Sequence, residues 1–455
     1  MHESCTSKRE MEEIMKRNKL LQFFSATLLA AMLLSACGSS VPNSSADTSA
    51  GTTGQSSAQE GTGQTEISFS FWGNQEEIDN KLALVAEFEK QNPDIKIKPV
   101  YTDGGQYQTK LQTWFSSGDT PDAMGIAGDI IYDYVKTGMF EDLTPRIEND
   151  GLQDSWAESA SQNFVYDGKQ YGLPHIYHVY CITYNKKLFD EAGLAYPTQD
   201  WTLDDFTTMA QALTKGEGSE KVYGLGGYGA YGANEYIHVF GDPTYGWEDG
   251  FTIFPNGTDG FVKGLEFFGN MINVDQTTPG PDSDANDIGF DSGRFGMYIA
   301  APWWISTWQT QIGDNFEWDL VTFPKVEGGA WYARVFPNGM GIPAASQHKD
   351  EAWRLIKWLC ADEEAQAIAS KTGMPNLTSY ATSDEFKNTL EPGWKPYNKQ
   401  AFVDALEHTW MTQNTGIFDQ INTIVYNEFP NYLSGNLTAE AFIEKIEAKG
   451  SEIAE

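Results

Sequence analysis

The chain has 455 residues, with 30 Lys and Arg against 64 Asp and Glu, a formal net charge of −34, and 40% hydrophobic and 13% aromatic residues. This length and apolar content suit two or three folded domains and exclude a disordered protein. The negative charge, in a sequence without a basic run that could form a binding stripe, argues against nucleic acid as a partner.

The N-terminal segment has the pattern of an export signal. A basic cluster at Lys16–Lys19 precedes a mostly apolar run over 20–34. That run is shorter than the roughly 20 residues that a membrane-spanning helix needs. It ends in Leu34-Ser35-Ala36-Cys37-Gly38, which resembles the bacterial lipobox. We therefore predict a lipoprotein signal peptide over 1–36 and lipid attachment at Cys37, with an uncleaved short helix as the alternative.

We predict that residues 37–65 form a flexible, lipid-anchored linker. The stretch is rich in Ser, Thr, Gly and Gln, and Val41 is its only large apolar residue, so it cannot bury enough surface to fold. A flexible chain of this length spans roughly 30 Å. Beyond it, Cys181 and Cys360 lie in apolar stretches, which favours buried free thiols and leaves a disulfide between them as the alternative.

From Glu66 onward, predicted strands alternate with predicted helices. Glu66–Trp72 alternates apolar and polar residues, Leu82–Glu89 has helical spacing, and Ile95–Val100 alternates again. The next predicted elements are a helix over Tyr107–Phe115, a buried strand over Pro121–Ile126 and a helix over Asp129–Gly138. This alternation indicates a parallel sheet that is covered by helices on both faces.

A second α/β unit is predicted further along the chain. Its strand covers Val179–Tyr184 and is followed by a helix over Lys187–Glu191. Another helix opens at Trp201–Phe206, with Thr202 as N-cap and Asp205 in the capping-box position. The remaining predicted helices cover Asp350–Ser370, which has the clearest amphipathic stripe, and then Gln400–Met411, Ile417–Phe429 and Thr438–Lys449.

Several runs in this order resemble the family-1 extracellular solute-binding proteins, the sugar-capturing subunits of ABC importers, to which maltose-binding proteins belong. The resemblance covers Glu66 to the end of the chain. The runs that carry it are Phe88–Pro93, Gly118–Asp122, Gly168–Pro174, Tyr184–Leu194, Trp201–Phe206, Phe290–Met297, Ala301–Trp304 and Ala344–Trp353.

The resemblance implies an α/β fold of the two-lobed, type II periplasmic-binding-protein kind. Each lobe is expected to be a mainly parallel sheet flanked by helices, and a hinge joins the two lobes around a ligand cleft. We expect lobe 1 to comprise 66–174 plus 334–378 and lobe 2 to comprise 175–333 plus 379–455. The chain is then expected to cross between lobes near Pro174–Tyr177, Arg334–Asn338 and Met374–Lys395.

A sugar site needs aromatic side chains that stack on the apolar face of the ring and polar side chains that bind its hydroxyls. Trp72 lies at the C-terminal end of the first predicted strand, where open α/β sheets bind ligands, and Asn74 and Glu76 begin the next helix. The resemblance implies that this loop contacts ligand. The alternatives are that Trp72 caps the lobe core and that Glu76 is only a charge at a helix start.

Five further residues complete the predicted site. Asp129 follows a strand at a position where the family has a ligand-contacting aspartate, and Trp303 matches the family's stacking tryptophan, with Trp304 beside it. Tyr231, on a Gly-rich loop, is the expected aromatic plate of the second lobe. Arg334, near a predicted crossover, is expected to bind ligand, with a structural salt bridge as the alternative.

Two other patterns fail as cofactor sites. The Gly-rich stretch 223–232 lacks the glycine spacing and the Lys-Ser/Thr of a nucleotide loop. Asp282–Asp287 places oxygen ligands at alternate positions, but it lacks the Gly and the bidentate Glu of a calcium loop. The histidines show no paired metal-binding spacing, so we expect neither a metal nor a cofactor.

We therefore predict a non-enzymatic lipoprotein on the extracytoplasmic face of the cell membrane. It is expected to act as a monomer, to capture a carbohydrate, with an oligosaccharide favoured by the aromatic content, and to deliver it to the transmembrane subunits of an ABC permease. One alternative is a secreted glycoside hydrolase, because aromatic plates and carboxylates also occur in such enzymes. Another is a sugar-sensing partner of a membrane kinase.

Overall fold

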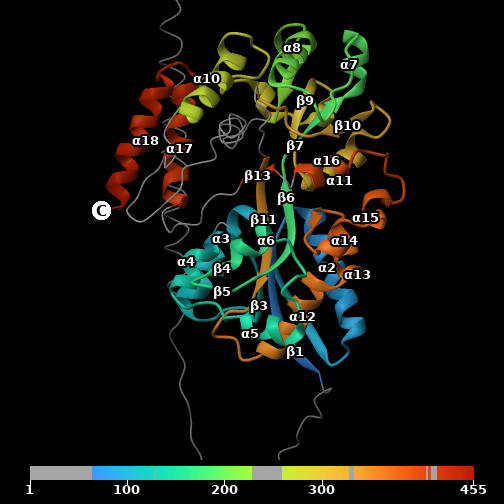
Figure 1. Cartoon of the computed structure of the whole chain (residues 1–455), viewed down its shortest axis with the longest axis vertical. Coiled ribbons are helices and arrows are strands. Elements are labelled where there is room, and N and C mark those ends of the chain that lie inside the picture. Colours follow the sequence, from blue (N-terminus) through green and yellow to red (C-terminus); the bar gives the residue numbers. More distant parts are fainter. Residues whose placement is uncertain are drawn as a thin grey trace, which may run out of the picture. The chain divides into compact units, whose positions relative to one another are not determined.

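Two mixed sheets organise the chain in the computed structural model, which describes residues 64–128, 130–227, 259–326, 333–405, 408–410 and 418–454 (Figure 1). Residues Gly61–Glu455 form one compact unit. Within the described residues, one sheet has seven strands and the other has four. We call the elements around the seven-stranded sheet the first lobe and those around the four-stranded sheet the second lobe.

The first lobe is built on the strand order β12-β6-β11-β3-β1-β2, with β13 beside β11. Its strands are β1 (Thr65–Trp72), β2 (Ile95–Thr102), β3 (Ala123–Ala127), β6 (Leu173–Val179), β11 (Ala333–Gly341), β12 (Met374–Pro375) and β13 (Thr409–Trp410). Its helices are α2 (Gln75–Gln91), α3 (Gly104–Ser117), α4 (Ile131–Lys136), α5 (Thr144–Asp150), α6 (Glu158–Ser161), α12 (Lys349–Ala361) and α13 (Glu363–Ala369), and a small hairpin joins β4 (Val165–Tyr166) to β5 (Lys169–Gln170).

The sheet of the first lobe differs from the expected mainly parallel arrangement. Strand β1 pairs in parallel with β2 and β3, as the alternation of strands and helices predicts. Strands β11, β6 and β12 add an antiparallel half. Strand β11 enters this half directly from the other lobe, after β10, and not through a βαβ crossover within its own sheet, so its direction is not fixed as parallel.

The second lobe has the strand order β10-β7-β9-β8, in which only β8 and β9 are parallel. Its strands are β7 (Cys181–Asn185), β8 (Tyr223–Gly226), β9 (Phe295–Ala300) and β10 (Trp318–Val321). The helices that follow these strands or pack near them are α7 (Lys186–Ala192), α8 (Leu203–Leu213), α10 (Asp259–Asn273), α11 (Pro302–Ile312), α14 (Thr378–Ala381), α15 (Asp384–Asn388), α16 (Gln400–Ala405), α17 (Phe418–Leu433) and α18 (Ala439–Ala454).

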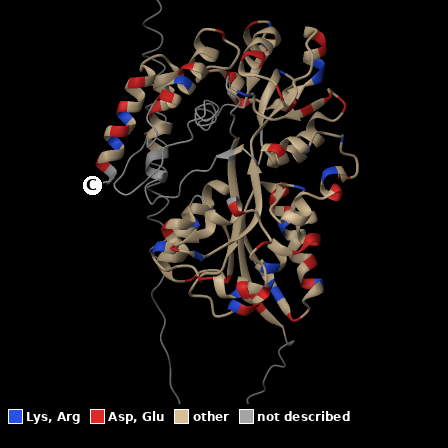
Figure 2. Cartoon of the chain, in the orientation of Figure 1, with Lys and Arg blue, Asp and Glu red and all other residues tan. Residues whose placement is uncertain are grey.

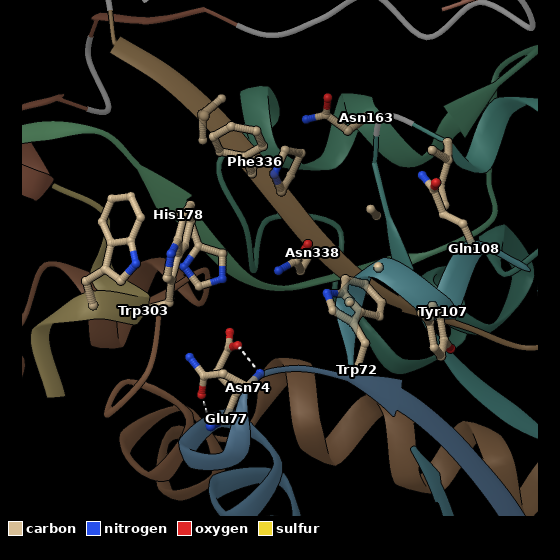
Figure 3. Close-up of a pocket in the computed structure, with 17 residues that line it drawn as sticks. Trp72, Asn74, Glu77, Tyr107, Gln108, Asn163, His178, Trp303, Phe336 and Asn338 are labelled. Carbon is tan, nitrogen blue, oxygen red and sulfur yellow. Dashed lines mark hydrogen bonds between the residues drawn. The ribbon is translucent and has the colours of Figure 1, made fainter. Parts of the chain in front are cut away.

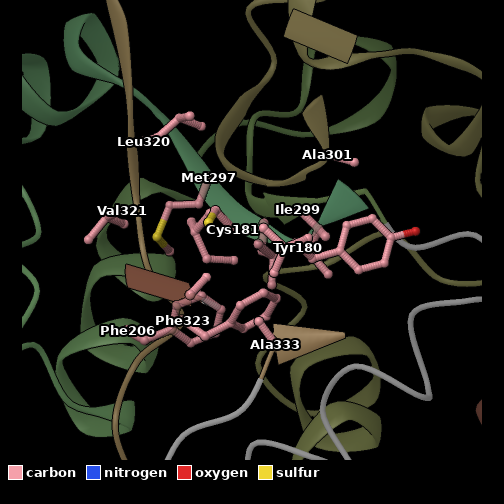
Figure 4. Packing of buried hydrophobic residues seen from close by; sticks show 14 of the residues in the cluster. Tyr180, Cys181, Phe206, Met297, Ile299, Ala301, Leu320, Val321, Phe323 and Ala333 are labelled. Carbon is pink, nitrogen blue, oxygen red and sulfur yellow. The ribbon is translucent and has the colours of Figure 1, made fainter. Parts of the chain in front are cut away.

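Each lobe has its own apolar core. In the second lobe, Cys181, Phe206, Met297 and neighbouring residues of all four strands pack together out of contact with water (Figure 4). Cys181 lies in this core, while Cys360 lies in the core of the first lobe. Both thiols are free, so the alternative of a disulfide between them is not realised. Burial raises the pKa of each thiol, which keeps it protonated.

The chain passes from the first sheet to the second at a single residue. Strand β6 pairs with β11 through Val179, and β7 begins pairing with β9 at Cys181, so only Tyr180 lies between them. The first sheet thus continues five residues beyond the expected lobe boundary at 174. It does so because Leu173–Val179 is buried throughout and pairs on both sides, with β11 and β12.

Two predicted helices are shorter than their patterns suggested. The helix expected over 350–370 is split at Asp362, whose Oδ1 accepts hydrogen bonds from the backbone N–H groups of Glu364 and Ala365 and so begins α13. The helix expected over 400–411 ends at Ala405. By contrast, the capping box predicted between Thr202 and Asp205 is confirmed at the start of α8.

A buried carboxylate joins the last two helices. Glu428 of α17 is 6% exposed, its Oε1 lies 2.8 Å from Lys449 Nζ, and Lys445 Nζ contacts its Oε2. Both lysines belong to α18, on which Lys and Glu alternate (Figure 2). Hydrogen bonds from Lys445 and then Lys449 lower the pKa of Glu428 from 4.5 to about 2.

This pair predicts a loss of stability in acid. Because the pKa of Glu428 is depressed in the folded state, its contribution is fully present above pH 4.5 and is lost as the pH falls toward 2. We expect Glu428→Gln to lower the free energy of unfolding by about 2 kcal/mol at pH 7, reduced from the full shift by the half-exposed lysines. Chemical denaturation should show this difference shrinking below pH 4.5 and approaching zero only near pH 2. Glu444→Gln, at an exposed position of α18, is the control and should change the free energy of unfolding little. A stability difference for Glu428→Gln that does not change with pH would contradict the prediction.

Among the described residues, no helix is both long enough and apolar enough to cross a bilayer. The signal segment 1–36, Cys37 and the linker up to residue 63 lie outside the described residues.

Candidate functional site

A cavity of about 590 Å³ lies between elements of the two lobes (Figure 3). The second lobe contributes Trp303 and Trp304 at the start of α11. The first lobe contributes Trp72, Asn74, Glu77, Gly104, Gly105, Tyr107, Gln108, Ala127, Ile130, Asn163, His178, Val335, Phe336, Pro337 and Asn338. Most of these residues follow the ends of β1 and β3 or lie on β6 and β11, so the sheet of the first lobe supplies one wall of the cavity.

Trp72 forms an aromatic plate at the end of β1. Its ring lies against Tyr107, with centroids 4.8 Å apart and planes at 41°. Gly125 leaves room for it, because a Cβ there would lie only 3.0 Å from the ring. The hydroxyl of Tyr107 lies 2.8 Å from Ser70 Oγ and 3.0 Å from Gly125 O. Trp72 is therefore held rigidly, with its exposed part turned to the cavity.

Tyr107 stays protonated beneath this plate. The residue is 3% exposed, and burial raises the pKa of its hydroxyl well above the ordinary value. A neutral hydroxyl can donate the hydrogen bond to Gly125 O while Ser70 Oγ satisfies the remaining capacity.

Trp303 and Trp304 form a second aromatic wall. Pro302 begins α11 directly after β9, which places both tryptophans in the first turn of the helix. The ring of Trp303 meets Phe336 nearly edge-on, with centroids 6.0 Å apart, while Trp304 stacks on Trp308 at 5.7 Å and 25°. In Figure 3, Trp303 and Trp72 lie on opposite sides of the cavity with Asn338 between them.

His178 brings a buried polar atom to the same cavity. Its ring lies 4.8 Å from that of Trp303 and is 3% exposed. Burial, together with the nearby charge of Lys81, lowers the pKa of His178 to about 3, so the imidazole is neutral at physiological pH. Its Nδ1 has no hydrogen-bond partner within the part of the chain that the structure describes. Because a buried polar atom is costly to leave unpaired, this nitrogen suits a ligand hydroxyl.

Asn74 and Glu77 have a double role at the start of α2. Asn74 Oδ1 accepts a hydrogen bond from the backbone N–H of Glu77, and Glu77 Oε2 accepts one from the backbone N–H of Asn74. This capping box fixes the start of the helix beside the cavity. Each bond uses only one of the two polar atoms of the side chain, so Asn74 Nδ2 and Glu77 Oε1 are suited to a ligand.

Four of the predicted site residues line the cavity: Trp72, Asn74, Trp303 and Trp304. Glu76 is not among the lining residues, and its neighbour Glu77 is. The carboxylate of Glu76 instead accepts hydrogen bonds from side chains of α11.

The other predicted residues are described in part or not at all. The backbone of Arg334 lies in β11 and pairs with Trp410, but its side chain is outside the described part, whereas the four residues after it line the cavity. Asp129 and Tyr231 lie outside the described residues. Ala127 and Ile130, on either side of Asp129, both line the cavity.

Sequence reasoning missed the lining residues of β6 and β11. His178, Phe336 and Asn338 lie on strands that read as apolar runs, where a single polar residue gives no signal of its own. They become neighbours because β11 pairs with β6, placing Phe336 opposite His178. Within the described residues, no group of three or more His, Cys, Asp or Glu side chains is placed to hold a metal ion.

Comparisons with known proteins agree with this architecture. The model of the family described as bacterial extracellular solute-binding protein matches residues 73–366. A putative binding protein of Brucella abortus is 27% identical over 314 residues, which cover 67% of this chain and 74% of that protein. The maltodextrin-binding protein MdxE of Bacillus subtilis is 26% identical over 369 residues, or 74% of this chain and 81% of that protein.

A solved structure supports the same conclusion for the fold. An ABC substrate-binding protein of Listeria monocytogenes, in complex with cycloalternan, superposes with a TM-score of 0.74 and 27% identity, covering 86% of this chain and 99% of that chain. The expected two-lobed α/β fold is thereby confirmed, with sheets that are more mixed than expected.

Proposed function

The chain belongs to the bacterial extracellular solute-binding protein family, and from this premise we propose that it captures an oligosaccharide between its lobes and delivers it to an ABC permease. The single observation that carries the proposal is that aromatic plates from both lobes, Trp72 and Trp303, face one cavity whose remaining lining is largely apolar or neutral and polar.

The chemistry of the lining fits a sugar. The tryptophan rings offer flat apolar faces to the C–H side of a pyranose, and Asn74, Asn338 and the neutral ring of His178 offer donors and acceptors to its hydroxyls. Neutral amide and imidazole groups suit neutral hydroxyls, because neither partner has to give up the strong hydration of a charge.

The size of the site favours more than one sugar ring. The cavity of about 590 Å³ is in the middle of the range of roughly 300–1,000 Å³ that ligand pockets occupy. Three tryptophans line it, and each additional sugar ring needs its own plate. Two of the similar proteins are named for, or solved with, oligosaccharides: a maltodextrin in one case and cycloalternan in the other.

The proposed role also requires attachment to the membrane and transfer of the ligand to the permease. We place the folded chain on the extracytoplasmic face of the membrane as a monomer, attached through a lipid on Cys37 and the linker 37–65. The basic cluster, apolar run and lipobox-like ending of the N-terminal segment support this attachment. Membership of the extracellular solute-binding family supports transfer of the ligand to permease subunits.

Binding without hydrolysis fits the described lining better than glycoside hydrolysis does. Glycosidases of the usual kind need a pair of carboxyl groups across the scissile bond. Among the lining residues that the structure describes, Glu77 alone carries a carboxylate, and its Oε2 is engaged in the capping box. The family and the similar proteins reported above are binding proteins.

A thermal-shift screen tests the proposed function. The chain from Gly38 onward would be melted with a panel of mono- and oligosaccharides, because a ligand that binds only the native state raises the melting temperature. We expect an increase of a few degrees with one class of oligosaccharide and a smaller one with its monosaccharide. Calorimetric titration would confirm the affinity. No shift with any saccharide, or the release of new reducing ends on incubation, would contradict the proposal.

A further inference from the structure

One polar contact joins the lobes beside the cavity. Glu76 lies in the first turn of α2, and its Oε2 accepts hydrogen bonds from Ser306 Oγ and, at 3.4 Å, from Thr307 Oγ1, both on α11. Helix α2 packs in the core of the first lobe and α11 in the core of the second. The contact therefore spans the two lobes.

The same face of α11 carries the contact and an aromatic plate. Ser306 and Thr307 follow Trp303 by three and four residues, the spacing that places side chains on one side of a helix. On the partner helix, the capping box of Asn74 and Glu77 fixes the first turn in which Glu76 lies. Holding α11 against α2 therefore also fixes where Trp303 stands relative to Trp72.

Helix α11 is also anchored within the second lobe. Gln309 Nε2 donates to Lys395 O and Gln309 Oε1 accepts from Lys395 N, both at 2.9 Å. This anchoring makes α11 rigid with respect to its own lobe. A contact made by Ser306 and Thr307 consequently restrains the whole second lobe, and not only the helix.

We propose that Glu76 is a positioning residue that latches the two lobes together through Ser306 and Thr307 and thereby sets the affinity for ligand without touching it. The effect on affinity rests on the proposed function, whereas the effect on the lobes of the free protein does not. If only the latched arrangement brings both tryptophan plates to the ligand, the apparent dissociation constant varies inversely with the latched fraction.

The test measures lobe separation and affinity in the same variants. Fluorescent labels would be placed at Gln112→Cys on α3 and Glu266→Cys on α10, both exposed positions, in the mature chain carrying Cys37→Ser. The buried thiols of Cys181 and Cys360 leave these two sites as the reactive ones. Energy transfer between the labels then reports the separation of the lobes in free and ligand-bound protein.

We expect Glu76→Ala to lower energy transfer in the free protein and to weaken oligosaccharide binding on the order of tenfold, the usual effect of losing a hydrogen bond to a charged group. The double variant Ser306→Ala/Thr307→Val, which leaves the carboxylate in place, should reproduce both changes. The triple variant should differ little from Glu76→Ala in affinity and energy transfer, because both sets of substitutions remove the same interaction. Glu76→Gln should recover part of both signals, since its amide oxygen still accepts hydrogen bonds.

Glu87→Ala is the matched control, because it removes a carboxylate from the same helix at a site that pairs with Lys90. It should leave both readouts unchanged. Weaker binding by Glu76→Ala with unaltered energy transfer, or additive effects of the Glu76 and Ser306/Thr307 substitutions, would overturn the latch. If the wild-type protein binds no saccharide, the proposed function fails, and the energy transfer of the free protein still decides whether the latch exists.

Discussion

Replacing Trp303 with alanine is expected to weaken oligosaccharide binding by roughly 30- to 100-fold. Removing the plate forfeits the burial of one ring face and the specific stacking contact, together about 2–3 kcal/mol. Each 1.4 kcal/mol corresponds to about tenfold in the dissociation constant. The ring is half-buried and packs edge-on against His178, Tyr180 and Phe336. It therefore also supports the positions of these neighbouring side chains. Isothermal titration with the best saccharide from the thermal screen measures the loss.

Trp394 offers a matched control for this substitution. It is also half-buried, but it lines a different cavity, near Lys399 and Tyr397. Trp394→Ala should leave the dissociation constant within about twofold of wild type even if it lowers the melting temperature. A Trp303→Ala protein that is folded and binds within threefold of wild type would show that the plate is not part of the site.

Substituting alanine at Gly224 is expected to destabilise the second lobe by about 3 kcal/mol, at the upper end of what overpacking costs. Strand β8 lies directly on α8, and a Cβ at Gly224 would stand 2.1 Å from the carbonyl oxygen of Ala210 and 2.6 Å from its Cα. These are backbone atoms, which no rotamer change can move. Strand β8 would have to move away from α8, which would also disturb the hydrogen bond that Gly224 N donates to Thr214 Oγ1, now 3.0 Å long. The melting temperature, followed by circular dichroism, should fall by several degrees.

Gly280→Ala controls for the effect of a glycine substitution as such. A Cβ there would meet only Ile272 Cγ2, at the ordinary contact distance of 3.6 Å. Its melting temperature should stay close to that of wild type. If both variants melt alike, the close approach of β8 to α8 does not limit the stability of the protein.

The sequence predicted those parts of the site that depend on local patterns. Trp72 ends an alternating strand, and Trp303 follows a proline after another strand, so their place at strand ends could be inferred without tertiary information. The prediction of Glu76 as a site residue shows the limit, because Glu77 and not Glu76 lines the cavity. Asn74 and Glu77 have the spacing of a capping box, which indicates which carboxylate turns back toward the strand end. That signal was in the sequence and points to Glu77.

Other parts of the site depend on pairing between distant segments. Asn338 and Phe336 face the cavity only because β11 inserts between β3 and β6, and the pairing of β11 with β6 shifts register just after Asn338. Neither the partner strand nor the irregularity can be read from the local sequence. The mixed character of the sheet was missed for the same reason, since strand direction depends on how the chain returns from the second lobe.

The position of β11 also determines when the first lobe can be completed during synthesis. The strand occupies residues 333–341 but lies in the interior of the sheet, between β3 and β6, whose residues are made much earlier. Until residue 341 has left the ribosome, β3 and β6 lack their shared neighbour, although the four strands of the second lobe have already been synthesised in between. A nascent chain of this topology cannot close its N-terminal lobe early, because an interior strand of the sheet is missing until three quarters of the chain has been made. The discontinuous lobe thus ties the folding of the N-terminal segment to contacts that are distant in sequence and formed late.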